Sequence, residues 1–216
     1  MAPGRVHVVR YSIYHSANCY LGSLLAERAL AGLPVEVELR PLCIPKERGF
    51  VVAHLVGGSE GPGRSSYNRE DCARWAQRYG IEMKMVEARV FAERARKWME
   101  SPLAREELAA CAYYGAVGSG REAALDRAFY RASYVDLLDV NDEEVVRRAA
   151  AEAGLDPDET IARAGAPETK ERLDRNLAEF DRAQCPGLPT WIVAGERFWG
   201  KDRVDWLAER VRQLCG

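Results

Sequence analysis

Ser16 and Cys19 are the first residues whose types and spacing could do chemistry, because they open a predicted helix directly after a predicted buried strand. A helix N-terminus offers free backbone N–H groups and about half a positive charge, so it can hold a thiolate or another anion. In thiol oxidoreductases this position carries C-x-x-C, and the first cysteine is the nucleophile. A serine cannot form a disulfide, but its hydroxyl can donate a hydrogen bond to the thiolate of another molecule. The residues therefore indicate either a site for a cofactor thiolate or a plain helix cap at Ser16 with a core cysteine at Cys19.

A second group of candidate residues lies on either side of a predicted hairpin near the C-terminus. Pro189 opens a predicted strand, where the Leu188–Pro189 bond can be trans at a sheet edge or cis. A cis bond would turn the N–H and C=O of Leu188 outward, where they could pair with a peptide-like ligand. Asp202 begins the last predicted helix, and its carboxylate can cap that helix or bind a ligand ammonium group. The residues alone leave both alternatives open at each position.

The elements that must position these residues can be predicted from hydrophobic periodicity. Both ends of the chain combine strands with a helix, and the short first crossover favours a parallel strand pair. The expected order is strand, helix, strand, then strand, strand, helix, over residues 6–9 (continuing towards 14), 19–32, 35–39, 190–193, 197–199 and 202–214.

The middle of the chain is predicted to be helical throughout. Residues 43–66 are irregular and rich in glycine, and no strand pattern interrupts the residues from there to 183. Helical patterns occupy residues 69–79, 87–99, 103–114, 121–138, 142–153, 156–163 and 167–183. The sequence thus predicts an α/β, thioredoxin-like fold formed by residues 1–42 and 184–216, with a large all-helical insertion domain over residues 43–183.

Length and composition restrict the class of protein. The chain has 216 residues, 47% hydrophobic and 30% charged, and a net charge of -2 from 31 basic and 33 acidic residues. So weak a charge disfavours nucleic acid or an acidic membrane as partner, and no apolar run approaches the roughly 20 residues of a membrane span. Because residues 1–10 lack the apolar segment of a signal peptide, we expect a soluble, cytoplasmic protein. Its six cysteines contain no C-x-x-C pair, so we expect neither a zinc knuckle nor a dithiol redox pair. A cytoplasmic location also argues against structural disulfides.

Together these segments resemble the family of kappa-class glutathione transferases and 2-hydroxychromene-2-carboxylate isomerases, a branch of the DsbA-like thioredoxin superfamily. The resemblance covers most of the chain. Its most specific part is similar to the family's G-V-P-T-F and G-E-x-F-W-G-x-D-R, at residues 187–191 and 195–203. Weaker matches are the serine tetrad at residues 16–19, an arginine-proline pair at 40–41, and a basic, tyrosine and aspartate pattern at Arg64, Tyr67 and Asp71.

The resemblance implies a DsbA-like fold, glutathione as cofactor, a small-molecule substrate and a homodimer. It implies that Ser16 is the catalytic residue, which hydrogen-bonds the glutathione thiolate. A donor and a helix dipole would both raise the ionised fraction of a thiol whose ordinary pKa is about 8.5. The implied cofactor-binding residues are Arg64, Leu188, Pro189, Lys201 and Asp202, of which the last two match positions at the γ-glutamyl end. Polar candidates for the substrate side, each of which also suits ordinary packing, are Tyr14, His15, Asn18 and Cys19.

Several activities remain open from the sequence. In a glutathione-dependent isomerase, the thiolate adds reversibly to a conjugated carbon–carbon double bond and is regenerated, whereas a glutathione transferase releases the conjugate. A thiol oxidoreductase using Cys19 is disfavoured by the serine at residue 16. A phosphate-binding loop at residues 58–65 nearly matches G-x-x-x-x-G-K-[ST], but Arg64 replaces the lysine and Pro62 lacks an N–H. A noncatalytic scaffold is the remaining alternative, and glutathione binding would count against both of the last two.

Overall fold

The computed structural model describes residues 5–46 and 61–216, apart from the side chains of residues 61–65. The chain divides into two compact units, Met1–Leu42 with Arg175–Gly216 and Cys43–Asp174. Helix α9 (Pro167–Arg182) contributes residues to both units. In the described ranges, none of the helices combines the length and apolar character that crossing a lipid bilayer requires.

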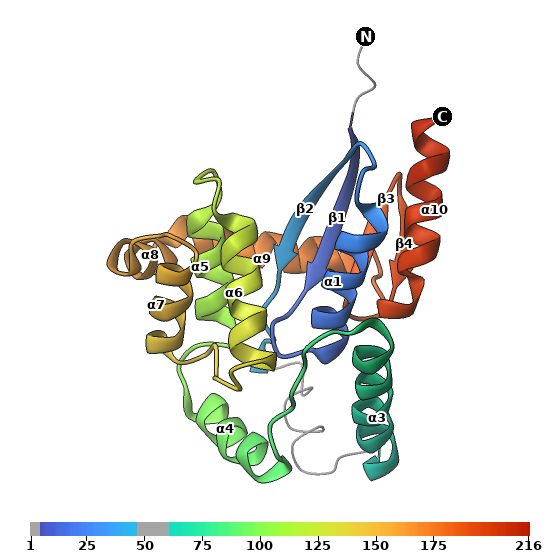
Figure 1. The fold of residues 1–216 in the computed structure, drawn as a ribbon. Coiled ribbons are helices and arrows are strands. Elements are labelled where there is room, and N and C mark those ends of the chain that lie inside the picture. The colour runs from blue at the N-terminus through green and yellow to red at the C-terminus, as the bar shows by residue number, and fades with distance from the viewer. Residues whose placement is uncertain (1–4, 47–60) are drawn as a thin grey trace. The chain divides into compact units, whose positions relative to one another are not determined.

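The first unit is built on a four-stranded mixed sheet in the order β2-β1-β3-β4 (Figure 1). Strands β1 and β2 are parallel and joined by helix α1, while β3 is antiparallel to both of its neighbours. This order confirms the predicted thioredoxin-like α/β fold. The elements of the unit besides α9 are β1 (Val6–Ser12), α1 (Ala17–Leu30), β2 (Val35–Pro41), β3 (Thr190–Val193), β4 (Glu196–Trp199), the 3-10 helix η2 (Lys201–Arg203) and α10 (Val204–Cys215).

Apolar residues at strand and helix spacing form the core of this unit. Val8 on β1 lies opposite Val37 on β2 and Val193 on β3, and it is fully buried. Helix α10 packs against α1, β1 and β3, and Leu21 and Leu207 are fully buried. Burial of each fully buried apolar side chain contributes about 1.5–3 kcal/mol to stability. Because α10 packs against both α1 and the strands, this packing holds α1 in place relative to the sheet.

The second half of α9 is held to the sheet of the same unit by an arginine. Arg40 on β2 donates to both carboxylate oxygens of Glu38, at 2.8 and 3.0 Å, and to the hydroxyl of Tyr11 at 3.0 Å. It also pairs with Glu179 on α9. Phe180 meets the Tyr11 ring edge-on, with 5.4 Å between centroids. A planar guanidinium can make these bonds at once, and a lysine cannot.

The second unit is helical in its described residues, as the periodicity predicts. The alanine-rich helix α5 is almost entirely buried, and it packs against α6, α7 and α8. Phe129 and Leu125 on α6 and Val146 on α7 are fully buried. The helices are α3 (Gly61–Tyr79), α4 (Ala88–Glu100), α5 (Glu107–Ala116), α6 (Glu122–Tyr134), α7 (Glu143–Glu152) and α8 (Pro157–Ala164).

Three helix boundaries differ from the prediction by four residues or more. Helix α3 begins at Gly61 rather than at residue 69. Pro62 is tolerated there because the first N–H groups of a helix have no partner within the helix, so the N–H that proline lacks is not missed. The helix predicted over 121–138 ends at Tyr134, and Leu137 takes the left-handed conformation with φ 58°. The helix predicted from 103 begins at Glu107, after Glu106 with φ 69°.

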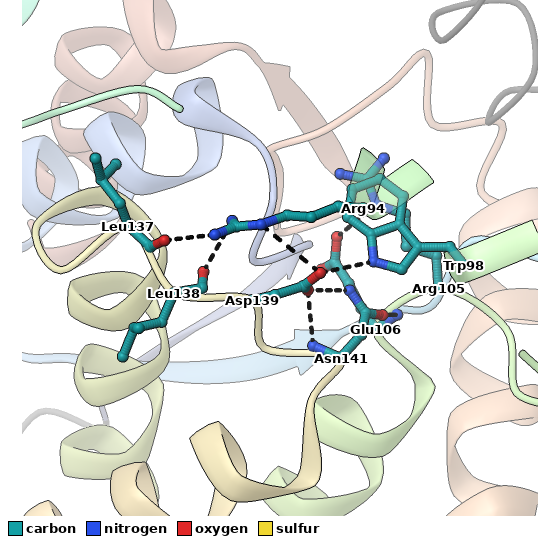
Figure 2. Close-up of polar contacts among 8 residues, drawn as sticks. All are labelled: Arg94, Trp98, Arg105, Glu106, Leu137, Leu138, Asp139 and Asn141. Carbon is teal, nitrogen blue, oxygen red and sulfur yellow. Dashed lines mark hydrogen bonds and ion pairs between the residues drawn. The ribbon is translucent and has the colours of Figure 1, made fainter. Parts of the chain in front are cut away.

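A buried carboxylate explains why the chain leaves helical geometry between α6 and α7 (Figure 2). Asp139 is 5% exposed, and its Oδ1 accepts from the backbone and side-chain N–H groups of Asn141 at 3.0 and 2.6 Å. Its Oδ2 accepts from the Trp98 indole on α4 at 3.1 Å. Arg94, also on α4, donates to the carbonyls of Leu137 and Leu138 at 2.5 and 3.3 Å. These bonds hold α4 against the loop after α6.

The same cluster fixes the start of α5. The Asn141 side chain accepts from the backbone N–H of Glu106 at 2.6 Å, and the carboxylate of Glu106 is fully buried. The guanidinium of Arg105 lies 3.9 Å from the Trp98 ring centroid and 3.7 Å from a Glu106 carboxylate oxygen. Burial lowers the pKa of Arg105, while the neighbouring Glu106 carboxylate opposes that shift. Figure 2 shows these side chains meeting from three segments of the chain.

Candidate functional site

The first part of the candidate site is the N-terminus of α1. Ser16 is its N-cap, with φ -105° and ψ 113°, and the hydroxyl oxygen accepts from the backbone N–H of Cys19 at 3.3 Å. The hydroxyl is half-buried, and its proton has no acceptor among the described residues. The first turn of α1 carries no acidic residue. This helix end therefore retains its positive potential and one hydroxyl donor.

The second part is the loop that enters β3. The Leu188–Pro189 peptide bond is cis, which resolves the alternative that the sequence left open. The carbonyl of Pro189 accepts from the N–H of Gly200 at 3.0 Å, so the loop is tied to the end of β4. Among the described residues, the backbone N–H and C=O of Leu188 have no hydrogen-bond partner. One peptide unit is thus available to an extended ligand.

Gly22 brings this loop against α1. A Cβ at Gly22 would lie 2.8 Å from Cη2 of Trp191 and 3.0 Å from Cγ of Pro189. Only a glycine permits this approach, although glycine inside a helix costs about 0.5–1 kcal/mol relative to alanine. Gly22 is less than two helical turns from Ser16. The close contact therefore holds the Leu188 peptide and the start of α1 in a fixed relation within one unit.

The third part is η2, which follows β4 and packs against α1. Lys201 is 7% exposed, and its ammonium donates to the side-chain oxygen of Asn18 at 2.8 Å. Asp202 is exposed and accepts from Arg203 at 2.7 Å. Gly200 has φ 101°, and a Cβ there would lie 2.5 Å from Oδ1 of Asp202. The glycine thus leaves the Asp202 carboxylate its position beside the backbone.

The structure brings together most of the residues that the sequence analysis named. Ser16, Asn18, Leu188, Pro189, Lys201 and Asp202 all belong to the first unit. Ser16 and Asn18 lie at the start of α1, Lys201 bonds Asn18, and Pro189 bonds Gly200, which precedes η2. Tyr14 and Cys19 are fully buried, and His15 is half-buried. Arg64 has its backbone in the first turn of α3 in the other unit, and its side chain lies outside the described residues.

Two features of the site were not predicted from the sequence. Lys201 donates from its ammonium to Asn18, a bond that the sequence did not suggest, and its contact with a γ-glutamyl group stays a prediction. Gly22 was not recognised as part of the site, although a glycine within a helical pattern is itself a signal of close backbone approach. Of the near-match to a phosphate loop, residues 58–60 lie outside the described part, and Gly61 onward is helix rather than loop.

The six cysteines are free thiols. Cys19, Cys43, Cys72 and Cys111 are buried. Burial raises the pKa of Cys43 to about 12 and that of Cys111 to about 11, so both are protonated at neutral pH. Burial also raises the pKa of Cys185. The thiolate is the reactive form of cysteine, so these three thiols lack the microenvironment of a redox nucleophile.

The family model of the DSBA-like thioredoxin domain matches residues 7–212, and the chain belongs to this family. A 2-hydroxychromene-2-carboxylate isomerase structure is similar with a TM-score of 0.72 and 20% identity, covering 97% of this chain and 96% of that chain. A probable DsbA oxidoreductase from Streptomyces coelicolor is similar with a TM-score of 0.71 and 19% identity, over 97% and 91% of the two chains. The cytosolic disulfide reductase DsbM from Pseudomonas aeruginosa, solved with GSH, is similar with a TM-score of 0.61 and 16% identity, over 97% of each chain. At these identities the likeness shows the fold, and no curated protein sequence matches the chain.

Proposed function

We propose that the protein is a glutathione-dependent isomerase of the 2-hydroxychromene-2-carboxylate isomerase type, acting on a conjugated small molecule. The observation that carries the proposal is a serine hydroxyl, in place of a cysteine thiol, at the N-cap of α1 in a DsbA-like fold. The resemblance in sequence to the isomerase family, and the similar structure of an isomerase, point to the same activity.

The residues present fit glutathione in three respects. Ser16 has a hydroxyl proton that is free for an anionic sulfur, beside a helix end without carboxylates. Leu188 has a free N–H and C=O, which suit the backbone of a tripeptide. Asp202 is exposed, and a carboxylate that already accepts from Arg203 retains lone pairs for an ammonium group. The structure of DsbM with GSH supports the same ligand class.

When bound, glutathione would supply a thiolate nucleophile for reversible addition to a conjugated double bond of the substrate. Ser16 donates its hydroxyl proton to the sulfur as a hydrogen bond, and the N-terminus of α1 stabilises the negative charge. Leu188 holds the ligand backbone, and Asp202 accepts from its ammonium group. By fixing the sulfur at one point, these residues convert a bimolecular encounter into a step within one complex.

Calorimetric titration of the reduced protein with glutathione tests the cofactor site. We expect saturable binding that Asp202→Ala weakens. Ser16→Asp is the sharpest variant, because aspartate is as good an N-cap as serine but its negative charge repels a thiolate. It should keep the stability of the wild type and lose glutathione binding. Absence of binding by the wild type at millimolar glutathione would contradict the proposal.

Turnover separates the two glutathione-dependent activities. With a 2-hydroxychromene-2-carboxylate and glutathione, an isomerase changes the substrate while the glutathione concentration stays constant. Consumption of glutathione would identify a transferase instead. Ser16→Ala should lower turnover by about a hundredfold, as loss of one charge-stabilising donor typically does. The matched control is Ser23→Ala, which removes a hydroxyl bonded to the Tyr20 carbonyl within the same helix and should leave turnover unchanged.

We also propose that the enzyme is a cytoplasmic homodimer without nucleic-acid or membrane partners, as the resemblance and the weak net charge of -2 suggest. Light scattering on the eluting peak of a gel-filtration column measures the mass directly. A peak at the mass of one chain would contradict the dimer.

A further inference from the structure

Lys201 on η2 is the only buried lysine among the described residues. It occupies the variable residue of the G-x-D-R motif. Lysines are almost never buried without a partner, and this one bonds the side-chain oxygen of Asn18 at 2.8 Å. Asn18 lies two residues after the N-cap Ser16. A positive charge is therefore anchored within the first turn of α1.

The sign of this charge is unusual for its place. A helix N-terminus carries about half a positive charge, so cations are favoured at the other end of a helix and disfavoured at this one. The first turn of α1 itself contains no acidic residue. An anion bound at Ser16 would interact favourably with both the helix end and the ammonium group. A bound anion would therefore offset the unfavourable placement of a cation at this end of the helix.

Resting on the function proposed above, we propose that Lys201 is a positioning residue for the thiolate rather than a ligand of the γ-glutamyl end. Its ammonium, held by Asn18, adds positive charge beside Ser16 and increases the ionised fraction of the bound thiol. The Asn18 amide fixes where that charge stands. Asp202, the next residue, remains the group that accepts from the ligand's ammonium.

Other charged and titratable groups lie on η2 and on the elements packed against it, and the variants of Lys201 and Asn18 below leave these groups unchanged. Asp202 and Arg203 pair with each other on η2, and Glu196 on β4 pairs with Arg210 on α10 at 2.7 Å. Helices α1 and α10 and strand β4 pack against η2. Their titratable or charged residues include Cys19 on α1, Arg197 on β4 and Asp205 on α10, and His15 directly precedes α1.

The test compares glutathione with S-methylglutathione, which has the same γ-glutamyl end but no ionisable thiol. In Lys201→Met we expect the apparent pKa of bound glutathione, followed by thiolate absorbance, to rise by about 1, as for loss of one nearby opposite charge. The affinity for S-methylglutathione should stay unchanged. The matched control Asp202→Asn should weaken both ligands by the same factor and leave the thiol pKa unaltered.

Asn18→Leu gives a second route to the same answer, since it keeps the lysine but removes the amide that anchors it. It should also raise the pKa of the bound thiol, and circular dichroism checks that both variants fold. If the wild type binds neither ligand, the proposed function and this inference both fail. If the wild type binds both ligands, and Lys201→Met weakens them equally with no change in thiol pKa, the proposed function stands. This inference is then overturned, and Lys201 contacts the γ-glutamyl end.

Discussion

Removal of the Asp139 carboxylate should destabilise the protein far more than removal of a surface carboxylate in the same loop. The side chain is 5% exposed and accepts three hydrogen bonds, two from Asn141 and one from the Trp98 indole. It also lies 4.0 Å from Nε of Arg94. In Asp139→Ala the buried Trp98 N–H and the partly buried Asn141 N–H groups would lose this acceptor.

The expected cost can be worked out from these contacts. A hydrogen bond to a charged group contributes about 1.5–3 kcal/mol, and breaking a buried charged cluster by removing one partner costs about 3–5 kcal/mol. We expect Asp139→Ala to lower the free energy of unfolding by about 4 kcal/mol. Asp136, a partly exposed carboxylate that pairs with the exposed side chains of Arg131 and Arg148, is the matched control. Asp136→Ala should cost less than about 1 kcal/mol.

A double-mutant cycle isolates the indole bond. Trp98→Phe keeps an aromatic ring but removes the N–H that bonds Asp139. Urea unfolding followed by far-UV circular dichroism gives the free energy of unfolding of the wild type, both single variants and the double variant. The double variant should be destabilised by about 1.5 kcal/mol less than the sum of the two single variants, because each single change already removes the same hydrogen bond. Additivity within about 0.3 kcal/mol would refute the coupling of α4 to this loop through Asp139.

Two further predictions concern a glycine and a buried thiol. Gly200→Ala and Gly118→Ala both place alanine at positive φ, 101° and 91°, so both should lower stability. A Cβ at Gly118 would meet no other atom, whereas a Cβ at Gly200 would displace the Asp202 carboxylate. Only Gly200→Ala should therefore weaken glutathione binding in calorimetry, and equal binding by both variants would contradict this. Burial raises the pKa of Cys111 to about 11, so its unfolded thiol ionises from about pH 8.5 while the folded thiol stays neutral. Stability present at neutral pH should therefore fall between about pH 9 and 11, by about 1.4 kcal/mol per pH unit for this thiol. Urea unfolding of Cys111→Ala should lack that part of the slope, and an unchanged slope would count against burial as its cause.

The fold could be predicted from the sequence because its signals are local. The alternation of residues 35–39, the β-branched run near Val8 and the long amphipathic middle each identify an element without reference to the rest of the chain. The start of α3 was misjudged because glycine and proline near Gly61 are typical of both a loop and a helix N-terminus. The end of α6 was misjudged because Leu137 and Leu138 leave the helix to bond Arg94, which is distant in sequence.

The site was predictable where a motif names its residues, and not where a contact between distant segments defines it. Ser16 as an N-cap follows from a serine between a strand and a helix, and the structure confirms that cap. The bond from Lys201 to Asn18 joins residues at opposite ends of the chain, and no spacing rule connects them. Likewise the need for glycine at residue 22 follows from its close approach to Trp191 and Pro189, which are distant in the sequence.

The hydrogen bond from the Cys19 N–H to the Ser16 hydroxyl bears on the thiol chemistry that this helix end could support. The two side chains already stand at the spacing of a redox dithiol, at the helix end that lowers a thiol's pKa. Exchange of one oxygen for sulfur, in Ser16→Cys, would create C-x-x-C in an otherwise unchanged chain. A single substitution at this residue would therefore place two thiols at the spacing that disulfide chemistry uses, at a helix end that favours the thiolate.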